Sequence, residues 1–119
     1  MALSYRLEEG IVIICVDGNM DQFTAQQLDL RLSQITDKMN PVKIILDLSS
    51  CPYMGSSLIG KFAQFYRDIA AKSGCVVFCS LRPFVKNLFT VTKLDEYFDV
   101  TADLPSAKRL IQGKFPGVF

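Results

Sequence analysis

Short apolar runs of strand length alternate along this chain with longer segments in which apolar residues recur at helical spacing. The runs Leu3 to Leu7 and Ile11 to Val16 flank Glu8-Glu9-Gly10, and together they predict an N-terminal hairpin of two antiparallel strands. From Asp21 or Thr24 to Met39, apolar residues repeat every three or four positions, which predicts an amphipathic helix. Asn40-Pro41 should end this helix.

The second half of the chain continues the same alternation. Val42 to Leu48 is almost continuously aliphatic, which is typical of a strand covered on both faces. A broad apolar stripe predicts a helix from Ser56 to Lys72 that ends at Ser73-Gly74. The remaining predicted elements are a strand at Val76 to Ser80, a short helix from Arg82 or Pro83 to Thr90, a short strand at Tyr97 to Val100 and a last helix at Ser106 to Gln112 that is started by Pro105. In the short helix, Phe84, Leu88 and Phe89 are expected to face inward.

This order of elements predicts an α/β fold. Strands that alternate with helices form a parallel sheet, because the crossover connections place the helices on its faces. We therefore expect a mixed, mostly parallel sheet of about five strands flanked by four helices, with the N-terminal hairpin supplying the antiparallel member. The length of 119 residues suits one domain over residues 1–119.

Composition narrows the choice of partners. The 13 Lys and Arg residues balance 12 Asp and Glu residues and are scattered along the chain, so nucleic-acid binding is not expected. Met1 to Gly10 lacks the pattern of a signal peptide, and no apolar run is long enough to span a bilayer. We expect a cytoplasmic protein without direct membrane insertion.

The residue types for catalysis and metal binding are sparse. The chain has no histidine, and three of its four cysteines lie in or beside apolar strand-like runs, where a reduced thiol packs as a small hydrophobe. Ser56 has no histidine or lysine base nearby, and no phosphate-binding or dinucleotide-binding loop is present. The prediction is a protein that is not an enzyme, with no metal site, no catalytic residue and no cofactor.

Three loops should lie together at one end of the sheet. They are Asp17 to Asp21, Ser49 to Gly55 and Ser80 to Pro83, and each follows a predicted parallel strand. The second of these loops leads into Ser56-Ser57 at a helix start, where free N–H groups and a partial positive charge favour a phosphate. Both serines could equally be N-caps, and Asp21 could be a cap of the preceding helix.

The chain resembles the STAS domains (sulfate transporter and anti-sigma factor antagonist), above all the free-standing bacterial anti-sigma factor antagonists. Three ordered blocks carry the resemblance and cover nearly the whole chain. They are Gly18-Asn19-Met20-Asp21 with Thr24-Ala25; Ile44 to Leu48 with Met54-Gly55-Ser56-Ser57 and Gly60; and Val76 to Ser80 with Pro83, Val85, Leu88-Phe89 and Leu94.

The resemblance implies a partner switch. An unphosphorylated antagonist binds an anti-sigma factor that is also a serine kinase, and phosphorylation ends the binding. By position the acceptor would be Ser56, with Ser57 as the alternative, and a serine phosphatase would be a further partner. Beside the acceptor, the residues expected to face the partner are Met20, Asp21, Met54, Gly55, Ser57, Leu58 and Ser80, with Met54 and Leu58 partly exposed unless Leu58 packs into the core.

Two positions depart from the family pattern. Gly55 stands where the family usually carries Asp, and Leu58 stands where it usually carries Gly. A missing carboxylate removes a like-charge cost of roughly 1 kcal/mol beside a phosphoserine, and it also removes an element that a kinase could recognise. Two other functions stay open at this point: a STAS accessory subunit of a membrane lipid or anion transporter, and a nucleotide-binding or weakly hydrolytic domain.

Overall fold

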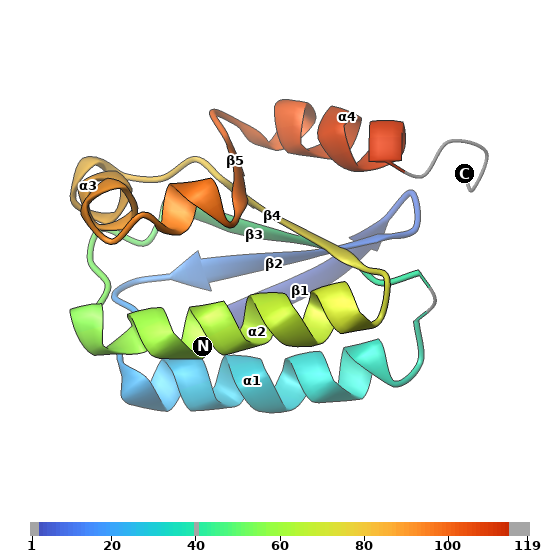
Figure 1. The fold of residues 1–119 in the computed structure, drawn as a ribbon, viewed down its shortest axis with the longest axis horizontal. Coiled ribbons are helices and arrows are strands. Elements are labelled where there is room, and N and C mark those ends of the chain that lie inside the picture. Colours follow the sequence, from blue (N-terminus) through green and yellow to red (C-terminus); the bar gives the residue numbers. More distant parts are fainter. Residues whose placement is uncertain (1–2, 40, 115–119) are drawn as a thin grey trace.

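The computed structural model describes residues 3–39 and 41–114. Within these residues the chain forms five strands, four α-helices and two 3₁₀ turns (Figure 1). The strands are β1 (Leu3–Glu8), β2 (Ile11–Asp17), β3 (Lys43–Ser50), β4 (Cys75–Cys79) and β5 (Asp99–Thr101). The helices are α1 (Gln22–Thr36), α2 (Ile59–Ala71), α3 (Pro83–Val91) and α4 (Leu104–Lys114), and the 3₁₀ turns are Ser56–Leu58 and Leu94–Glu96.

The strands form one sheet in the order β1-β2-β3-β4-β5. β1 pairs antiparallel with β2, and all other neighbours are parallel, so the predicted mixed sheet is confirmed. Glu9 and Gly10 form the two-residue hairpin loop, with φ values of 56° and 77°. Two successive positive φ angles are typical of the turn whose twist matches that of a hairpin, which explains the tight reversal.

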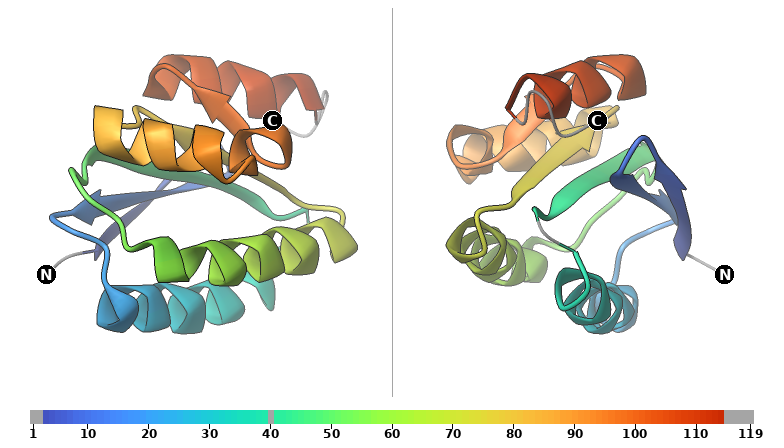
Figure 2. Two further views of the ribbon diagram at one scale, coloured as in Figure 1. Left: turned by 60° about the vertical axis from the view of Figure 1, so that its left-hand side comes forward. Right: turned by 90° about the vertical axis from the view of Figure 1, so that its right-hand side faces the viewer.

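Helices cover both faces of the sheet. α1 and α2 lie side by side on one face, and α4 lies on the other (Figures 1 and 2). The larger core lies beneath α1, α2 and α3, and Phe78 of β4 is at its centre, edge-on to Phe62, Phe89 and Phe98. A smaller core beneath α4 is built mainly of isoleucine side chains, together with Val77, Ala107 and the thiols of Cys75 and Cys79. Burial of both strand faces explains why β3 reads as a continuous aliphatic run.

Several predicted boundaries differ from the structure by a few residues. The first helix, which was expected to run to Met39, ends at Thr36. The segment expected as one helix from Ser56 begins instead with the 3₁₀ turn Ser56–Leu58, and α2 starts at Ile59. The last strand is Asp99–Thr101 because Leu94–Glu96 forms a 3₁₀ turn and the Phe98 amide donates to the Leu94 carbonyl. The last helix starts earlier than Ser106, since Asp103 accepts a hydrogen bond from the Ser106 amide at its first turn.

Gly74 is required by space where α2 turns back into β4. A Cβ atom at this position would lie 2.7 Å from the Val42 Cβ and 2.9 Å from both the Val42 carbonyl oxygen and the Ile69 Cγ2. The Gly74 amide donates to the Ile69 carbonyl, and the next amide, that of Cys75, donates to the Val42 carbonyl. The predicted end of the helix is therefore set by a backbone approach that only glycine permits.

In the part of the chain that the structure describes, no helix combines the length and the apolar character needed to cross a bilayer. All four cysteines are free thiols. Cys51, Cys75 and Cys79 are buried, and Cys15 is half-buried. Burial raises the pKa of the Cys79 thiol to about 12, and the nearby Asp47 carboxylate adds to this effect.

The Cys79 thiol should make the protein sensitive to alkali. Its pKa rises from an unfolded value near 9 to about 12, so its contribution to stability is complete below pH 9 and is lost as the pH rises toward 12. Between pH 8.5 and 11 we expect the free energy of unfolding, measured with urea, to fall less steeply with pH in Cys79→Ala than in the parent. The difference in slope should correspond to about one proton released on unfolding. Cys15→Ala is the matched control, and equal slopes for the parent and Cys79→Ala would contradict the assignment.

Candidate functional site

The loops that follow β2 and β3 are joined by backbone hydrogen bonds. The Gly18 amide donates to the Ser50 carbonyl (2.8 Å), and the Met20 amide donates to the Tyr53 carbonyl (3.0 Å). Met20 and Met54 form an isolated parallel bridge. The parallel pairing thus continues beyond the ends of both strands, and it holds the segment that leads into Ser56 in a fixed position.

Ser56 and Ser57 are exposed at the start of the 3₁₀ turn that leads into α2. The residue before them, Gly55, is extended (φ −69°, ψ 135°), and neither this turn nor α2 has a side-chain cap. The alternative that the serines are N-caps is therefore wrong. Within residues 3–39 and 41–114, neither hydroxyl takes part in a hydrogen bond, so both are available to another molecule.

The expectation that Met54 is partly exposed is wrong, and the core packing weighed for Leu58 is confirmed; Met20, which was expected to face the partner, is buried too. Their exposed fractions are 0%, 1% and 1%, respectively, and all three side chains belong to the larger core. The bridge between Met20 and Met54 turns both side chains inward, and Leu58 is the first residue of the apolar stripe of the helix. These three side chains pack in the core under the loop that carries the serines, so they hold its backbone in place but do not themselves contact a docked protein.

Asp21 is the N-cap of α1. Its carboxylate accepts a hydrogen bond from the Thr24 amide (2.8 Å), and this bond lowers the pKa of Asp21 below its ordinary value. The side chain nevertheless stays exposed, on the loop that is bonded to the Ser56 segment. The cap role expected for Asp21 is confirmed, and its charge remains at the surface.

The third loop, after β4, reaches the same edge of the sheet. Ser80 is half-buried, and its amide donates to the Thr101 carbonyl at the end of β5 (3.2 Å). Its φ of 61° lies in the left-handed region, which is uncommon for a residue other than glycine. The parallel order of β2, β3 and β4 confirms that all three predicted loops share one end of the sheet.

One feature of this edge was not found from the sequence. Tyr53, in the loop before Ser56, stacks on Phe84 of α3 with 4.8 Å between ring centroids. Both rings are about half exposed. The expectation that Phe84 faces inward is wrong, and a local pattern cannot show that a ring in the first turn of α3 meets a ring from the loop after β3.

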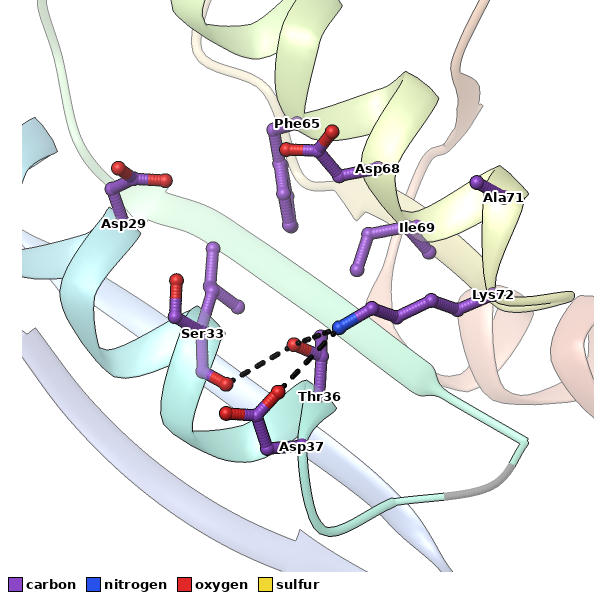
Figure 3. Close-up of a pocket in the computed structure, with 10 residues that line it drawn as sticks. Asp29, Ser33, Thr36, Asp37, Phe65, Asp68, Ile69, Ala71 and Lys72 are labelled. Carbon is purple, nitrogen blue, oxygen red and sulfur yellow. Dashed lines mark hydrogen bonds and ion pairs between the residues drawn. The ribbon is translucent and has the colours of Figure 1, made fainter.

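The groove between the C-terminal halves of α1 and α2 lies away from the serines. Figure 3 shows its lining residues, among which Lys72 donates to the Thr36 hydroxyl (3.1 Å) and pairs with the Asp37 carboxylate (3.7 Å). These contacts link the ends of the two helices. Since both helices start at the edge that carries Ser56, this groove belongs to the opposite end of the domain and is not part of the site.

The STAS domain profile matches residues 2–107. The chain belongs to the STAS domain family. A curated protein of Bordetella bronchiseptica, BtrV, which is assigned as an anti-sigma factor antagonist, is 24% identical over 116 residues, with 98% of this chain and 99% of that protein covered. The sequence resemblance to STAS domains is therefore confirmed.

Solved structures share the fold of this STAS domain. A protein of Thermotoga maritima, assigned as an anti-sigma factor antagonist, superposes with a TM-score of 0.83 at 18% identity, covering 92% of this chain and 94% of that one. The anti-sigma factor antagonist SpoIIAA in its unphosphorylated form gives a TM-score of 0.80 at 21% identity, covering 94% and 97%. The phosphorylated form of SpoIIAA from Bacillus gives 0.69 at 18% identity, covering 92% and 99%.

The structure gives a physical reading of the two departures from the family pattern. Leu58 is buried in the larger core, so it contributes to packing. The position of Gly55 does not require the conformational freedom of glycine, because its backbone is extended and an added Cβ would meet only the Ser57 Oγ, at 3.7 Å.

In the described residues no three metal-binding side chains come together.

Proposed function

We propose that this STAS domain is the antagonist in a partner switch, in which its unphosphorylated form binds an anti-sigma factor with serine kinase activity. The observation that supports this most directly is the exposed, unbonded Ser56 hydroxyl on a segment held by the Met20–Met54 bridge. Phosphorylation of Ser56 would end the binding, and a serine phosphatase would restore it. The existence of SpoIIAA in both forms supports the same cycle for a relative of the same fold.

A phosphate suits this position in the free protein. Phosphoserine adds about −1.5 to −2 charges, which would move the net charge from +1 to near −1. Ser56 lies at the N-terminal end of the 3₁₀ turn and α2, where the partial positive charge of a helix start favours a phosphate, so we expect the modified chain to keep its fold. In a closed interface the same group would cost desolvation and repulsion, so the modification acts on binding.

The test is incubation of the purified chain with each serine-kinase anti-sigma factor of its host and ATP, followed by phosphopeptide mapping. We expect one phosphate on Ser56 in the parent and none in Ser56→Ala. Ser57→Ala is the matched control and should still be modified. Modification that persists in Ser56→Ala and disappears in Ser57→Ala would assign the acceptor to Ser57, and no modification by any of these kinases would refute the partner switch. A pull-down with the chain that recovers a membrane permease in place of a kinase would favour the alternative function, an accessory subunit of a transporter.

Gly55→Asp restores the carboxylate usual in the family. Because the backbone at Gly55 is extended and its Cβ direction is open, we expect the free energy of unfolding to change by no more than about 0.5 kcal/mol. Chemical denaturation measures this. Gly74→Asp is the contrasting variant, since its Cβ would collide with Val42, and it should be strongly destabilised. A rate change of phosphorylation in Gly55→Asp would then report kinase recognition and not folding.

A further inference from the structure

The Tyr53–Phe84 stack presents an apolar surface next to the serines. The rings are tilted by 34° with centroids 4.8 Å apart, so each covers one side of the other and leaves the outer side to solvent. The exposed fractions are 47% for Tyr53 and 50% for Phe84. A single exposed apolar residue needs no explanation, but two large rings brought together at the surface from a loop and the first turn of a helix form a patch.

Both rings are held in place before any partner arrives. The Tyr53 carbonyl accepts the hydrogen bond from the Met20 amide, which fixes the backbone of its loop. Phe84 lies in the first turn of α3, directly after Pro83, whose fixed φ suits a helix start. Rigid aromatic side chains lose little conformational entropy on binding, which is why such residues dominate the energetics of protein interfaces.

The charged side chains on the Phe84 side of the stack are basic, whereas Asp21 lies on the loop that is bonded to Tyr53. Arg82 and Lys86 flank Phe84 and are exposed, and neither forms an ion pair within the part of the chain that the structure describes. A docked protein that matches this surface would place carboxylates around an apolar pocket. Tyr53 is three residues before Ser56 on the same loop, so such a protein would cover the serine as well.

We propose that the Tyr53–Phe84 stack is an anchor for the anti-sigma factor, which receives both rings in an apolar pocket rimmed by acidic side chains. This rests on the proposed function and extends the docking surface from the Ser56 loop to α3. The stack supplies affinity, and Ser56 supplies the switch. Because the anchor is separate from the acceptor, loss of the rings weakens binding without altering the site of modification.

The experiment measures the dissociation constant of the full chain with the host's purified serine-kinase anti-sigma factor that binds the parent. We expect the double variant Tyr53→Ser/Phe84→Ser to bind about tenfold or more weakly. Tyr53→Phe keeps the stack and should bind within about twofold of the parent. Tyr97→Ser removes a ring that is 64% exposed and precedes β5, so it is the matched control and should also bind like the parent.

Charge reversal tests the basic rim. Arg82→Glu should slow association and weaken its dependence on salt, whereas Arg109→Glu on α4, across the sheet, should not. An unchanged circular dichroism spectrum would show that the double variant is folded. If this folded variant bound the anti-sigma factor as tightly as the parent does, the anchor would be overturned and the partner switch would be left intact. Loss of a dimer in the double variant, seen by sedimentation with unchanged kinase affinity, would overturn it in favour of a second copy. If no host anti-sigma factor binds the parent, the proposed function fails and the anchor fails with it.

Discussion

Replacement of Phe78 by alanine is expected to lower the free energy of unfolding by about 3–5 kcal/mol. Phe78 is fully buried in β4, and its ring meets Phe62, Phe89 and Phe98 edge-on, at centroid distances of 5.7, 5.2 and 4.7 Å. Truncation would remove the ring common to these contacts and leave a cavity that three rigid neighbours cannot fill. Urea denaturation followed by circular dichroism measures the loss.

Phe84→Ala is the matched control for that experiment, because its ring is half exposed and contacts the half-exposed Tyr53. We expect it to cost no more than about 1 kcal/mol. The two variants remove the same number of atoms, so their difference reports mainly the burial of the ring, with a smaller contribution from the different propensities of alanine in a strand and in a helix. Similar losses at both positions would mean that Phe78 is not the centre of the core.

The mixed, mostly parallel character of the sheet could be predicted because it follows from the order and type of the elements along the chain. The runs that became β2, β3 and β4 are strongly apolar and are separated by segments long enough for a crossover, which leaves a parallel arrangement as the expected result. Glu9-Gly10 gives the hairpin by its turn chemistry. Helix ends were predicted less well where tertiary contacts decide them, as at Asp103, whose side chain caps a helix that begins before Ser106.

The candidate site was predicted in outline. Convergence of three loops follows from parallel strands alone, and the exposed serines follow from the strand-to-helix junction. The burial of Met20 and Met54 did not follow, because it depends on a bridge between residues far apart in the sequence. The Tyr53–Phe84 stack was missed because Tyr53 lies in a loop without periodic signal, and because Phe84 was expected to face inward from its helix although it is half exposed.

The buried residues of the site support its fold, and the exposed residues are available to a docked protein. Met20, Met54 and Leu58 fix the backbone beneath the serines, and a change there would act on folding as well as on docking. Ser56 and Ser57 lie on the surface, and their hydroxyls form no hydrogen bond within the described residues, so a change there acts mainly on docking, whereas Asp21 is exposed but also caps α1. A binding loss at an exposed position is therefore informative about the partner, which makes Ser56 the position to test.

Ser56→Asp is expected to weaken binding to the anti-sigma factor by about 1–3 kcal/mol, the cost of closing an interface over an unpaired charge. The fold should not change, because Ser56 is exposed, its hydroxyl has no hydrogen bond in the described chain, and an acidic residue is favourable at the start of a helix. Isothermal titration calorimetry measures the affinity, and the melting temperature reports the fold.

Ser57→Asp is the control that separates the acceptor from its neighbour, since it adds the same charge one residue later on the same exposed turn. A charge effect specific to the acceptor predicts a smaller loss at Ser57 than at Ser56. A larger loss at Ser57 would transfer the assignment to that serine. Parental affinity in both variants would show that this edge of the sheet does not enter the interface, because no closed protein contact tolerates a new unpaired carboxylate without cost.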